Sequence, residues 1–373
     1  MSARRGFTLI ELLAATALFA VLGTMLFQIV RGAMDIWSVG ERNRELHDRA
    51  TAAMDVIVED LRAVWPGHPG AAEQDARFLL SPREEDHDRD GKPDLRASVL
   101  RFARLCHEER SLAWLRRAGD TAGAQGSVTE LTGQDPAELR PTGGLAESLY
   151  TLARLPGHEL PSLVRRFRAP LGGEGSLLAP ELVDQPDRLL AGAVPLADGV
   201  LHLGVACWAP HTTAWDEDPG SAGSPGAAAL GAWDSTRGLF PPADTAFPYG
   251  KGPASLLDGS DDMLPRLVRI TLVLDEREGG GAGGGRLADA LTKEARQLTL
   301  VSVGFLRDQE SPDHVLVGQE WMRVVGSEGR VLTVERGSRG TPATPHESGT
   351  SVRAGRAFER VVRLPAARED WNP

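Results

Sequence analysis

The chain has 373 residues, of which 41% are hydrophobic and 25% are charged, and its formal net charge is −11. This length allows one large domain or two modest ones, with enough apolar residues for a core. The acidic balance argues against nucleic acid as a partner, because phosphate binding requires a basic surface.

The first element is an apolar segment at residues 7–30, in which Glu11 is the single charged residue. A helix of this length rises about 36 Å, which is enough to cross a bilayer. Arg4 and Arg5 belong to a short basic leader, residues 1–6, and favour a cytoplasmic N-terminus. A secretory signal peptide fits less well, because its apolar core runs over about 7–15 residues and ends at a small-residue cleavage site.

Glu11 is the residue of this segment that requires an explanation. A carboxylate at the membrane centre costs up to about 3 kcal/mol, and ionisable residues in such places usually have a function. The alternative is an ordinary single-pass anchor with a stray acid near the membrane interface.

Residues 5–13, Arg-Gly-Phe-Thr-Leu-Ile-Glu-Leu-Leu, resemble the cleavage and methylation motif of type IV pilins and of type II secretion pseudopilins. The resemblance implies that prepilin peptidase cuts between Gly6 and Phe7 on the cytoplasmic side and methylates the new amine. Glu11 then stands where the family keeps its acid. In a packed fibre, Glu11 of one subunit can pair with the Phe7 amine of its neighbour, which offsets the cost of burying both charges and fixes the axial register.

Beyond Val30 the pattern becomes amphipathic over residues 31–66. Apolar residues recur there at spacings of three, four or seven, which is typical of a helix that lies on another element: Ile36, Val39, Leu46, Ala50, Ala53, Ile57, Leu61 and Val64. The charged residues between them, Glu59 and Asp60 included, are assigned to a solvated face. Together with the apolar segment this predicts one helix over residues 7–65, about 88 Å long. A free coiled-coil stalk is the alternative, which the strands that follow disfavour.

The body begins at residue 67 and contains short segments that are rich in β-branched and apolar residues, as strands are. They lie at residues 98–105, 148–155, 163–167, 200–208, 266–274, 297–305, 321–325, 331–336 and 358–364. Turn residues separate them, so we expect an α+β, pilin-like fold in which the long N-terminal helix packs on an antiparallel sheet.

The order of these segments resembles the J class of minor pseudopilins, and so do two stretches at residues 143–150 and 264–272. The resemblance implies a structural subunit in the bacterial inner membrane, with its leader in the cytoplasm and its body in the periplasm. Such a subunit joins other major and minor pseudopilins near the tip of the pseudopilus of a type II secretion system and supports protein export. A minor pilin of a type IV pilus, or a singly anchored calcium- or ligand-binding receptor, is the alternative.

The chain is longer than the family pattern, and the extra length lies in identifiable places. Within the body, 67–278, residues 209–260 are rich in Gly, Pro, Ala and Asp and indicate a long surface excursion. Residues 279–285 form a Gly-rich linker. In the C-terminal part, 286–373, residues 315–353 are a candidate small β module inserted before the last strand. Contact with partners and plain structural padding are both open for this module.

The acidic stretch at residues 86–94, Asp-His-Asp-Arg-Asp-Gly-Lys-Pro-Asp, is a candidate Ca²⁺ site. Alternating carboxylates and one backbone carbonyl, at Lys92, can supply the oxygen ligands: Asp86, Asp88, Asp90, Lys92 and Asp94. Ala97 stands where an EF-hand has its bidentate Glu, so the loop resembles the Asp-rich loops of thrombospondin type 3 repeats instead. A bound ion would order the loop that leads into the strand at 98–105. The alternative is a solvated acidic turn between the helix and that strand.

Two cysteines, Cys106 and Cys207, are too few for a disulfide scaffold or a four-cysteine zinc site. One disulfide between them and two buried thiols are both open. The sequence contains no Gly-x-Ser-x-Gly elbow, no His-Glu-x-x-His helix and no Walker motif. We therefore predict that the chain is not an enzyme.

Overall fold

The computed structural model describes residues 9–65, 78–85, 95–106, 144–169, 171–172, 175–179, 182–208, 215, 229–230, 233–235, 264–275, 285–303 and 312–365. The chain divides into two compact units, Met1–Arg49 and Ala50–Pro373. The described strands, all in the second unit, form three sheets. A long N-terminal helix followed by a largely antiparallel β body confirms the α+β class.

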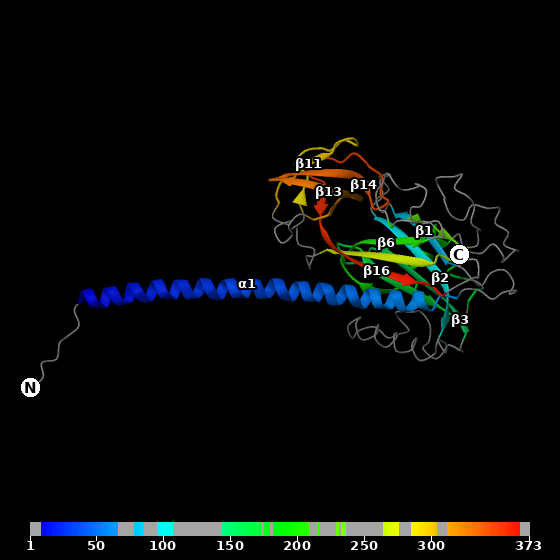
Figure 1. Cartoon of the computed structure of the whole chain (residues 1–373), viewed down its shortest axis with the longest axis horizontal. Helices are drawn as coiled ribbons and strands as arrows, with labels where there is room; N and C mark the ends of the chain where they lie inside the picture. Colours follow the sequence, from blue (N-terminus) through cyan, green and yellow to red (C-terminus); the bar gives the residue numbers. More distant parts are fainter. Residues whose placement is uncertain are drawn as a thin grey trace, which may run out of the picture. The chain divides into compact units, whose positions relative to one another are not determined.

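Helix α1, Leu9–Arg62, is the long N-terminal helix of Figure 1. By residue number it contributes to both units. Its predicted stripe is buried from Leu46 onward, whereas Ile36 is exposed. The helix ends in tight turns, where the amides of Ala63 and Val64 donate to the carbonyls of Asp60 and Leu61. Directly after these turns Val64 forms an isolated antiparallel bridge with Arg104. The end of the helix is therefore attached to the body through the backbone.

The first sheet has the order β5-β4-β3-β2-β1-β8. Its strands are β1 Phe78–Glu85, β2 Leu95–Cys106, β3 Gly144–Ala153, β4 Ser162–Arg168, β5 Val194–Ala197 and β8 Trp233–Asp234. Alternate residues of β3 face opposite sides. Leu149 packs with Leu189 of the short helix α4, Pro186–Leu190, whereas the Tyr150 hydroxyl reaches Asp60 of α1. Helical residues thus cover both faces of this sheet.

Strand β1 lies outside the segments expected to be strands, and it contains a proline. Pro82 lies opposite Ser98 of β2. The other neighbour, β8, pairs only with Leu79 and Leu80, so the edge beside Pro82 has no strand among the described residues. A proline is tolerated in such a place because its missing amide breaks no ladder hydrogen bond.

The second sheet has the order β16-β9-β6-β7. Its strands are β6 Val200–Trp208, β7 Ala229–Leu230, β9 Leu267–Asp275 and β16 Gly355–Arg363. Strands β9 and β16 pair along their whole length, from Gly355 opposite Asp275 to Arg363 opposite Leu267. The chain that separates them in sequence is therefore an insertion between two neighbouring strands.

This insertion is a small β module with its own sheet, in the order β10-β15-β12-β13-β14-β11. Its strands are β10 Gly285–Arg286, β11 Gln297–Thr299, β12 His314–Val317, β13 Glu320–Glu328, β14 Val331–Ser338 and β15 Ser351–Arg353. The module was expected at 315–353, but β10 and β11 belong to the same sheet, so it begins at Gly285. It has a core of its own: Leu287, Leu291, Leu298, Leu300, Val315, Val317, Met322, Leu332, Val334 and Val352.

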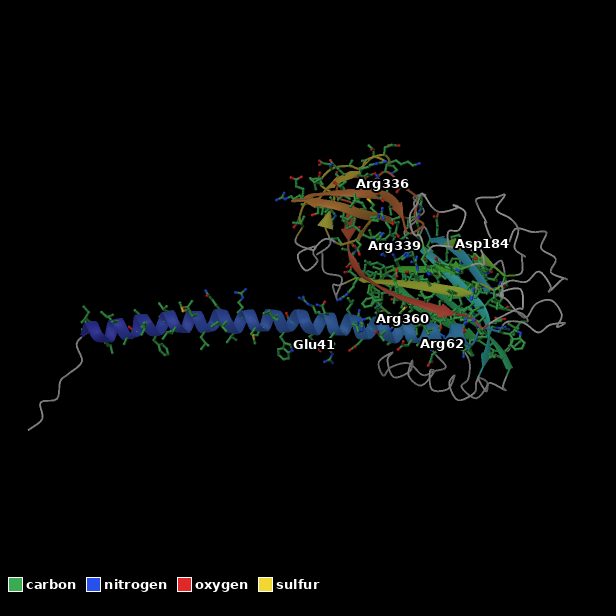
Figure 2. All side chains as sticks on the ribbon, in the orientation of Figure 1. Glu41, Arg62, Asp184, Arg336, Arg339 and Arg360 are labelled. Atoms are coloured by element: carbon green, nitrogen blue, oxygen red, sulfur yellow. The ribbon has the colours of Figure 1, made fainter. Side chains whose placement is uncertain are left out.

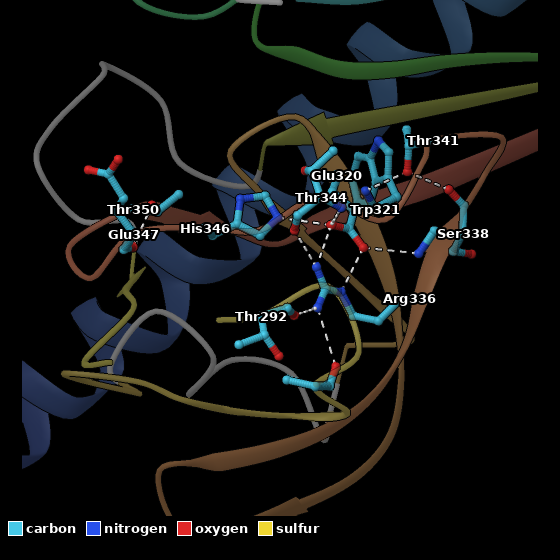
Figure 3. Close-up of polar contacts among 12 residues, drawn as sticks. Thr292, Glu320, Trp321, Arg336, Ser338, Thr341, Thr344, His346, Glu347 and Thr350 are labelled. Atoms are coloured by element: carbon cyan, nitrogen blue, oxygen red, sulfur yellow. Dashed lines mark hydrogen bonds and ion pairs between the residues drawn. The ribbon is translucent and has the colours of Figure 1, made fainter. Parts of the chain in front are cut away.

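The module also contains one buried carboxylate, Glu320, which is 1% exposed and joins several of its segments. Arg336 donates to both of its oxygens at 2.7 and 2.8 Å, and His346 Nε2 lies 2.9 Å from Oε2 (Figure 3). The amides of Gly337 and Thr344 donate to it as well. Burial alone would raise the pKa of Glu320, but these hydrogen bonds outweigh it and lower the pKa to about 2. The network is fully satisfied, as a buried polar cluster must be.

The module also contacts the body directly. Leu316 and Trp321 pack with Leu201 of β6 and Val273 of β9. Arg353 donates to Asp275 at 3.1 Å and to Glu159 at 2.7 Å. Both contacts lie inside the second compact unit.

Candidate functional site

The N-terminal part of α1 is apolar on all sides. Its large hydrophobic side chains are exposed in the isolated chain: Leu9, Ile10, Leu12, Leu13, Leu18, Phe19, Val21, Leu22, Met25, Leu26, Phe27, Ile29, Val30, Met34, Ile36 and Trp37. Figure 2 shows side chains of this segment standing out from the helix on more than one side. A helix that is apolar all round is a membrane span or becomes buried by neighbours, because water disfavours this surface by about 25 cal/mol per Å².

The two threonines of this segment satisfy their hydroxyls within the helix. Thr16 Oγ1 donates to the carbonyl of Leu13 at 2.9 Å, and Thr24 Oγ1 donates to the carbonyl of Ala20 at 2.8 Å. Such back-bonding leaves no donor that needs water. Both hydroxyls are therefore compatible with an apolar surrounding.

Among the described residues, α1 is the helix that is long and apolar enough to cross a membrane. Farther along it, exposed ion pairs appear between Arg44 and Asp48 and between Arg49 and Glu45, each at 3.7 Å. Pairs of this kind contribute little stability, but they indicate a water-facing surface. The change from lipid-compatible to water-compatible surface thus occurs along one continuous helix.

The predicted processing residues are placed only in part. Gly6 and Phe7 lie outside the described residues. Glu11 lies within α1, but its side chain is not described. Cleavage after Gly6, methylation of Phe7 and the pairing of Glu11 stay predictions.

The other end of α1 carries a site that the sequence pattern missed. Asp60 was assigned to the solvated face, yet it is 3% exposed and sits on β2, β3 and β4. Its Oδ2 accepts hydrogen bonds from Tyr150 Oη at 2.5 Å, Arg165 Nε at 2.8 Å and Ser148 Oγ at 3.1 Å. Arg104 pairs with its Oδ1. We call this group the Asp60 anchor: Asp60, Arg104, Ser148, Tyr150 and Arg165.

Burial keeps Tyr150 a hydrogen-bond donor. Desolvation raises the pKa of its fully buried phenol, against the opposing effect of Arg165 and Arg104. Both guanidinium groups also lie over the Phe167 ring, at 5.5 Å for Arg165 and 5.7 Å for Arg104. Every member of the anchor has a partner, so the buried charges are compensated.

A signal for Asp60 was present in the spacing. Asp60 follows Ile57 by three positions and precedes Val64 by four, so it shares the face of two buried residues. Asp60 was assigned to the solvated face by its residue type instead of its position on the helix, because carboxylates are almost never fully buried unless they are paired. The partners come from β2, β3 and β4, and no local pattern shows that pairing.

The candidate Ca²⁺ ligands, Asp86, Asp88, Asp90, Lys92 and Asp94, lie outside the described residues. The structure describes what flanks them: Glu85 ends β1, Leu95 begins β2, and the two residues are partners in the ladder. The acidic stretch therefore connects two antiparallel strands rather than the helix and a strand. Calcium binding stays a prediction.

The two cysteines lie on different sheets. Cys207 is buried on β6 as a thiol, and burial raises its pKa. Cys106 is the last residue of β2, and its side chain is not described. A disulfide between them and two buried thiols both stay open.

Comparison with known proteins places one segment of the chain. Residues 1–27 match the family described as the prokaryotic N-terminal methylation motif. This motif is the substrate signal of prepilin peptidase, and pilins assemble with other pilins. No curated protein and no solved structure matches the chain. The motif and the long apolar helix that begins within it fit a singly anchored, structural, type IV pilin-like protein of a pilus or a pseudopilus.

Proposed function

We propose that this pilin-like chain is a minor pseudopilin of the J class, assembled at or near the tip of the pseudopilus of a type II secretion system. The observation that carries the proposal is the methylation motif at residues 1–27, which extends into the exposed apolar N-terminal part of α1. The order of strands in the body, with β3 and β9 at the two stretches that resemble the J class, supports the finer assignment.

In this role the N-terminal part of α1 contacts the membrane and neighbouring subunits, and its last turns attach the body. The apolar part lies in the inner membrane before assembly and against neighbouring subunits after it. Glu11 pairs with the methylated amine of Phe7 of a neighbour and sets the axial register. The Asp60 anchor holds the last turns of the helix to β2, β3 and β4, so the body stays attached to its helix when the fibre moves.

A minor pilin of a type IV pilus is the second candidate, because the same N-terminal motif serves both machines. Calcium binding in the loop between β1 and β2 is compatible with either. In both cases the bound ion would brace a strand connection and would take no part in chemistry.

The experiment that separates the two candidates compares a strain lacking this gene with its parent. Secreted proteins are profiled and surface pili are counted from the same culture. Loss of secreted proteins with pili intact supports the pseudopilin. Loss of pili with secretion intact establishes the minor pilin, and loss of neither rejects both.

A further inference from the structure

A cavity of about 330 Å³ lies inside the second unit, where the β module meets the body. Strands β1, β2 and β6 of the body line one side, and the module lines the other with Leu316, Trp321 and the turn after β14. This volume is at the small end of the range for ligand pockets, which run from about 300 to 1,000 Å³. Nothing in the proposed assembly function uses this cavity.

The lining of the cavity carries more positive than negative charge. Arg83, Arg96 and Arg339 face it, against the carboxylate of Glu84. Glu84 is 59% exposed and already paired with Arg96 at 3.2 Å. The charge of the lining therefore favours an anion.

Arg83 is the most deeply buried of these cations, at 5% exposure. It is paired with Glu85, but its Nη1 has no hydrogen-bond partner among the described residues. Burial lowers its pKa to about 10. A buried guanidinium with an unused donor is costly, and an anion in the cavity would offset that cost.

Arg339, labelled in Figure 2, lies in the turn after β14 of the module. It lines the cavity from that side. Its backbone has φ 52°, the left-handed region that a glycine adopts without strain. Its guanidinium lies 4.7 Å from the centre of the Trp321 ring, which fixes the direction of the side chain. The fold thus holds the Arg339 guanidinium in a fixed direction beside the cavity, although the backbone of Arg339 is strained.

The remaining walls are uncharged. His202 packs edge-on against Trp321 at 5.7 Å, and burial, then Arg339 and His314, lower its pKa well below 6.5, so it is neutral. Leu203, Leu316 and Pro342 add apolar surface. A ligand that fills this space has a negative end for the arginines and an apolar part for Trp321 and its neighbours.

We propose that the cavity binds a carboxylate attached to an apolar group. Arg83 of the body and Arg339 of the module supply the guanidinium groups for the carboxylate, a pairing that Arg makes in bidentate form. Trp321 and Leu316 contact the apolar part. The carboxylate belongs to a small organic acid or to the C-terminus of a peptide, since both present the same chemistry.

Isothermal titration calorimetry on the full-length chain in detergent micelles tests the proposal, with sodium benzoate as the probe and neutral benzamide as the matched compound. We expect saturable one-to-one binding of benzoate and none of benzamide. Arg339→Gly, which also relieves the turn, should weaken benzoate binding by at least about tenfold. Arg330→Gln, an exposed arginine of the same module outside the cavity, should leave binding unchanged.

A short peptide ending in a free Phe carboxylate, compared with its amide, distinguishes the two sources. Tighter binding of the peptide than of benzoate assigns the C-terminus, and the reverse assigns the small acid. Thermal melting establishes that each variant is folded, and Arg83→Met serves as the second variant if Arg339→Gly unfolds. The proposal is overturned if benzoate shows no saturable binding up to about 10 mM. It is also overturned if a folded Arg339→Gly or Arg83→Met variant binds benzoate as tightly as the wild type does, or if inorganic phosphate binds as tightly as benzoate.

Discussion

Asp60 shows how one residue ties the long helix to the sheet beneath its last turns. Its carboxylate receives hydrogen bonds or ion pairs from residues of β2, β3 and β4. A neutral amide in its place leaves two buried guanidinium groups uncompensated. Removing one partner of a buried charged pair typically costs about 3–5 kcal/mol.

We therefore expect Asp60→Asn to lower the free energy of unfolding by about 3 kcal/mol. Urea unfolding of the purified chain, followed by circular dichroism, measures this change. The neighbouring exposed Glu59→Gln is the matched control and should change stability by less than about 0.5 kcal/mol. Equal effects of the two substitutions would show that the anchor contributes nothing particular.

Glu320 gives the module a defined dependence on pH. Its pKa falls from 4.5 to about 2 on folding, so the folded state favours the ionised form. A group with a depressed folded pKa contributes stability above its unfolded pKa and loses it as pH falls toward the folded value. We expect about 3 kcal/mol to be lost between about pH 5 and pH 2.

The check is a comparison of urea unfolding at about pH 7 and pH 3 for the wild type and for Glu320→Gln. The difference in stability between the two proteins should shrink at the lower pH. A difference that is the same at both pH values would mean that the ionisation of Glu320 does not stabilise the module.

At the scale of elements, the insertion between β9 and β16 is separable from the sheet that receives it. Gly355 and Asp275 are direct partners in the ladder, so a short turn can join the two strands. We expect replacement of residues 276–354 by a short Gly-Ser turn to leave a folded body. The cost should be a few kcal/mol, about 3, because Leu201 and Val273 lose their contacts with Leu316 and Trp321.

Far-ultraviolet circular dichroism and a thermal melt check this outcome. The deleted chain should keep its helix and strand signals and melt cooperatively at a lower temperature. Deletion of the central strand β6, in contrast, should abolish the cooperative transition. A module deletion that behaves like the β6 deletion would show that the module is needed to form the body.

The elements also show how far the sequence predicts this fold. The long helix follows from its periodicity, and the strands β2, β3, β4, β6, β9 and β16 overlap the segments that are rich in β-branched and apolar residues. Strand β1 was missed because Pro82 argues against a strand unless the edge beside it is unpaired. The module was expected only from residue 315 onward. Strand β10 is two residues long and carries no detectable pattern, whereas β11 lies in the expected strand at 297–305 and belongs to the module through its pairing with β14.

The candidate sites also differ in whether the sequence alone predicts them. The motif around Gly6, Phe7 and Glu11 is contiguous, so it is readable without any structure. The Asp60 anchor and the cavity beside Arg339 join residues far apart in the chain, which the packing of α1 on the first sheet and of the module on the body brings together. Patterns within a short stretch of sequence do not predict contacts of this kind.

At the scale of the whole molecule, the account requires that Glu11 matter through assembly and not through folding. We expect Glu11→Ala to leave the chain stable in the membrane but to reduce its incorporation into fibres by about tenfold or more, since a buried amine would lose its partner. Cross-linking to other subunits, followed by fractionation of sheared fibres, measures incorporation. Glu41→Ala, an exposed acid on the same helix, is the control and should assemble normally. Normal assembly of both variants would reject the pairing.

The central claim, that this chain is processed and assembled as a pilin-like subunit, is tested most directly by mass spectrometry of its N-terminus after purification from the native membrane. We expect a mature chain that begins at Phe7 and carries one methyl group on its amine. A chain that still begins at the leader, with residues 1–6 intact, would contradict the account and leave a singly anchored membrane protein in its place.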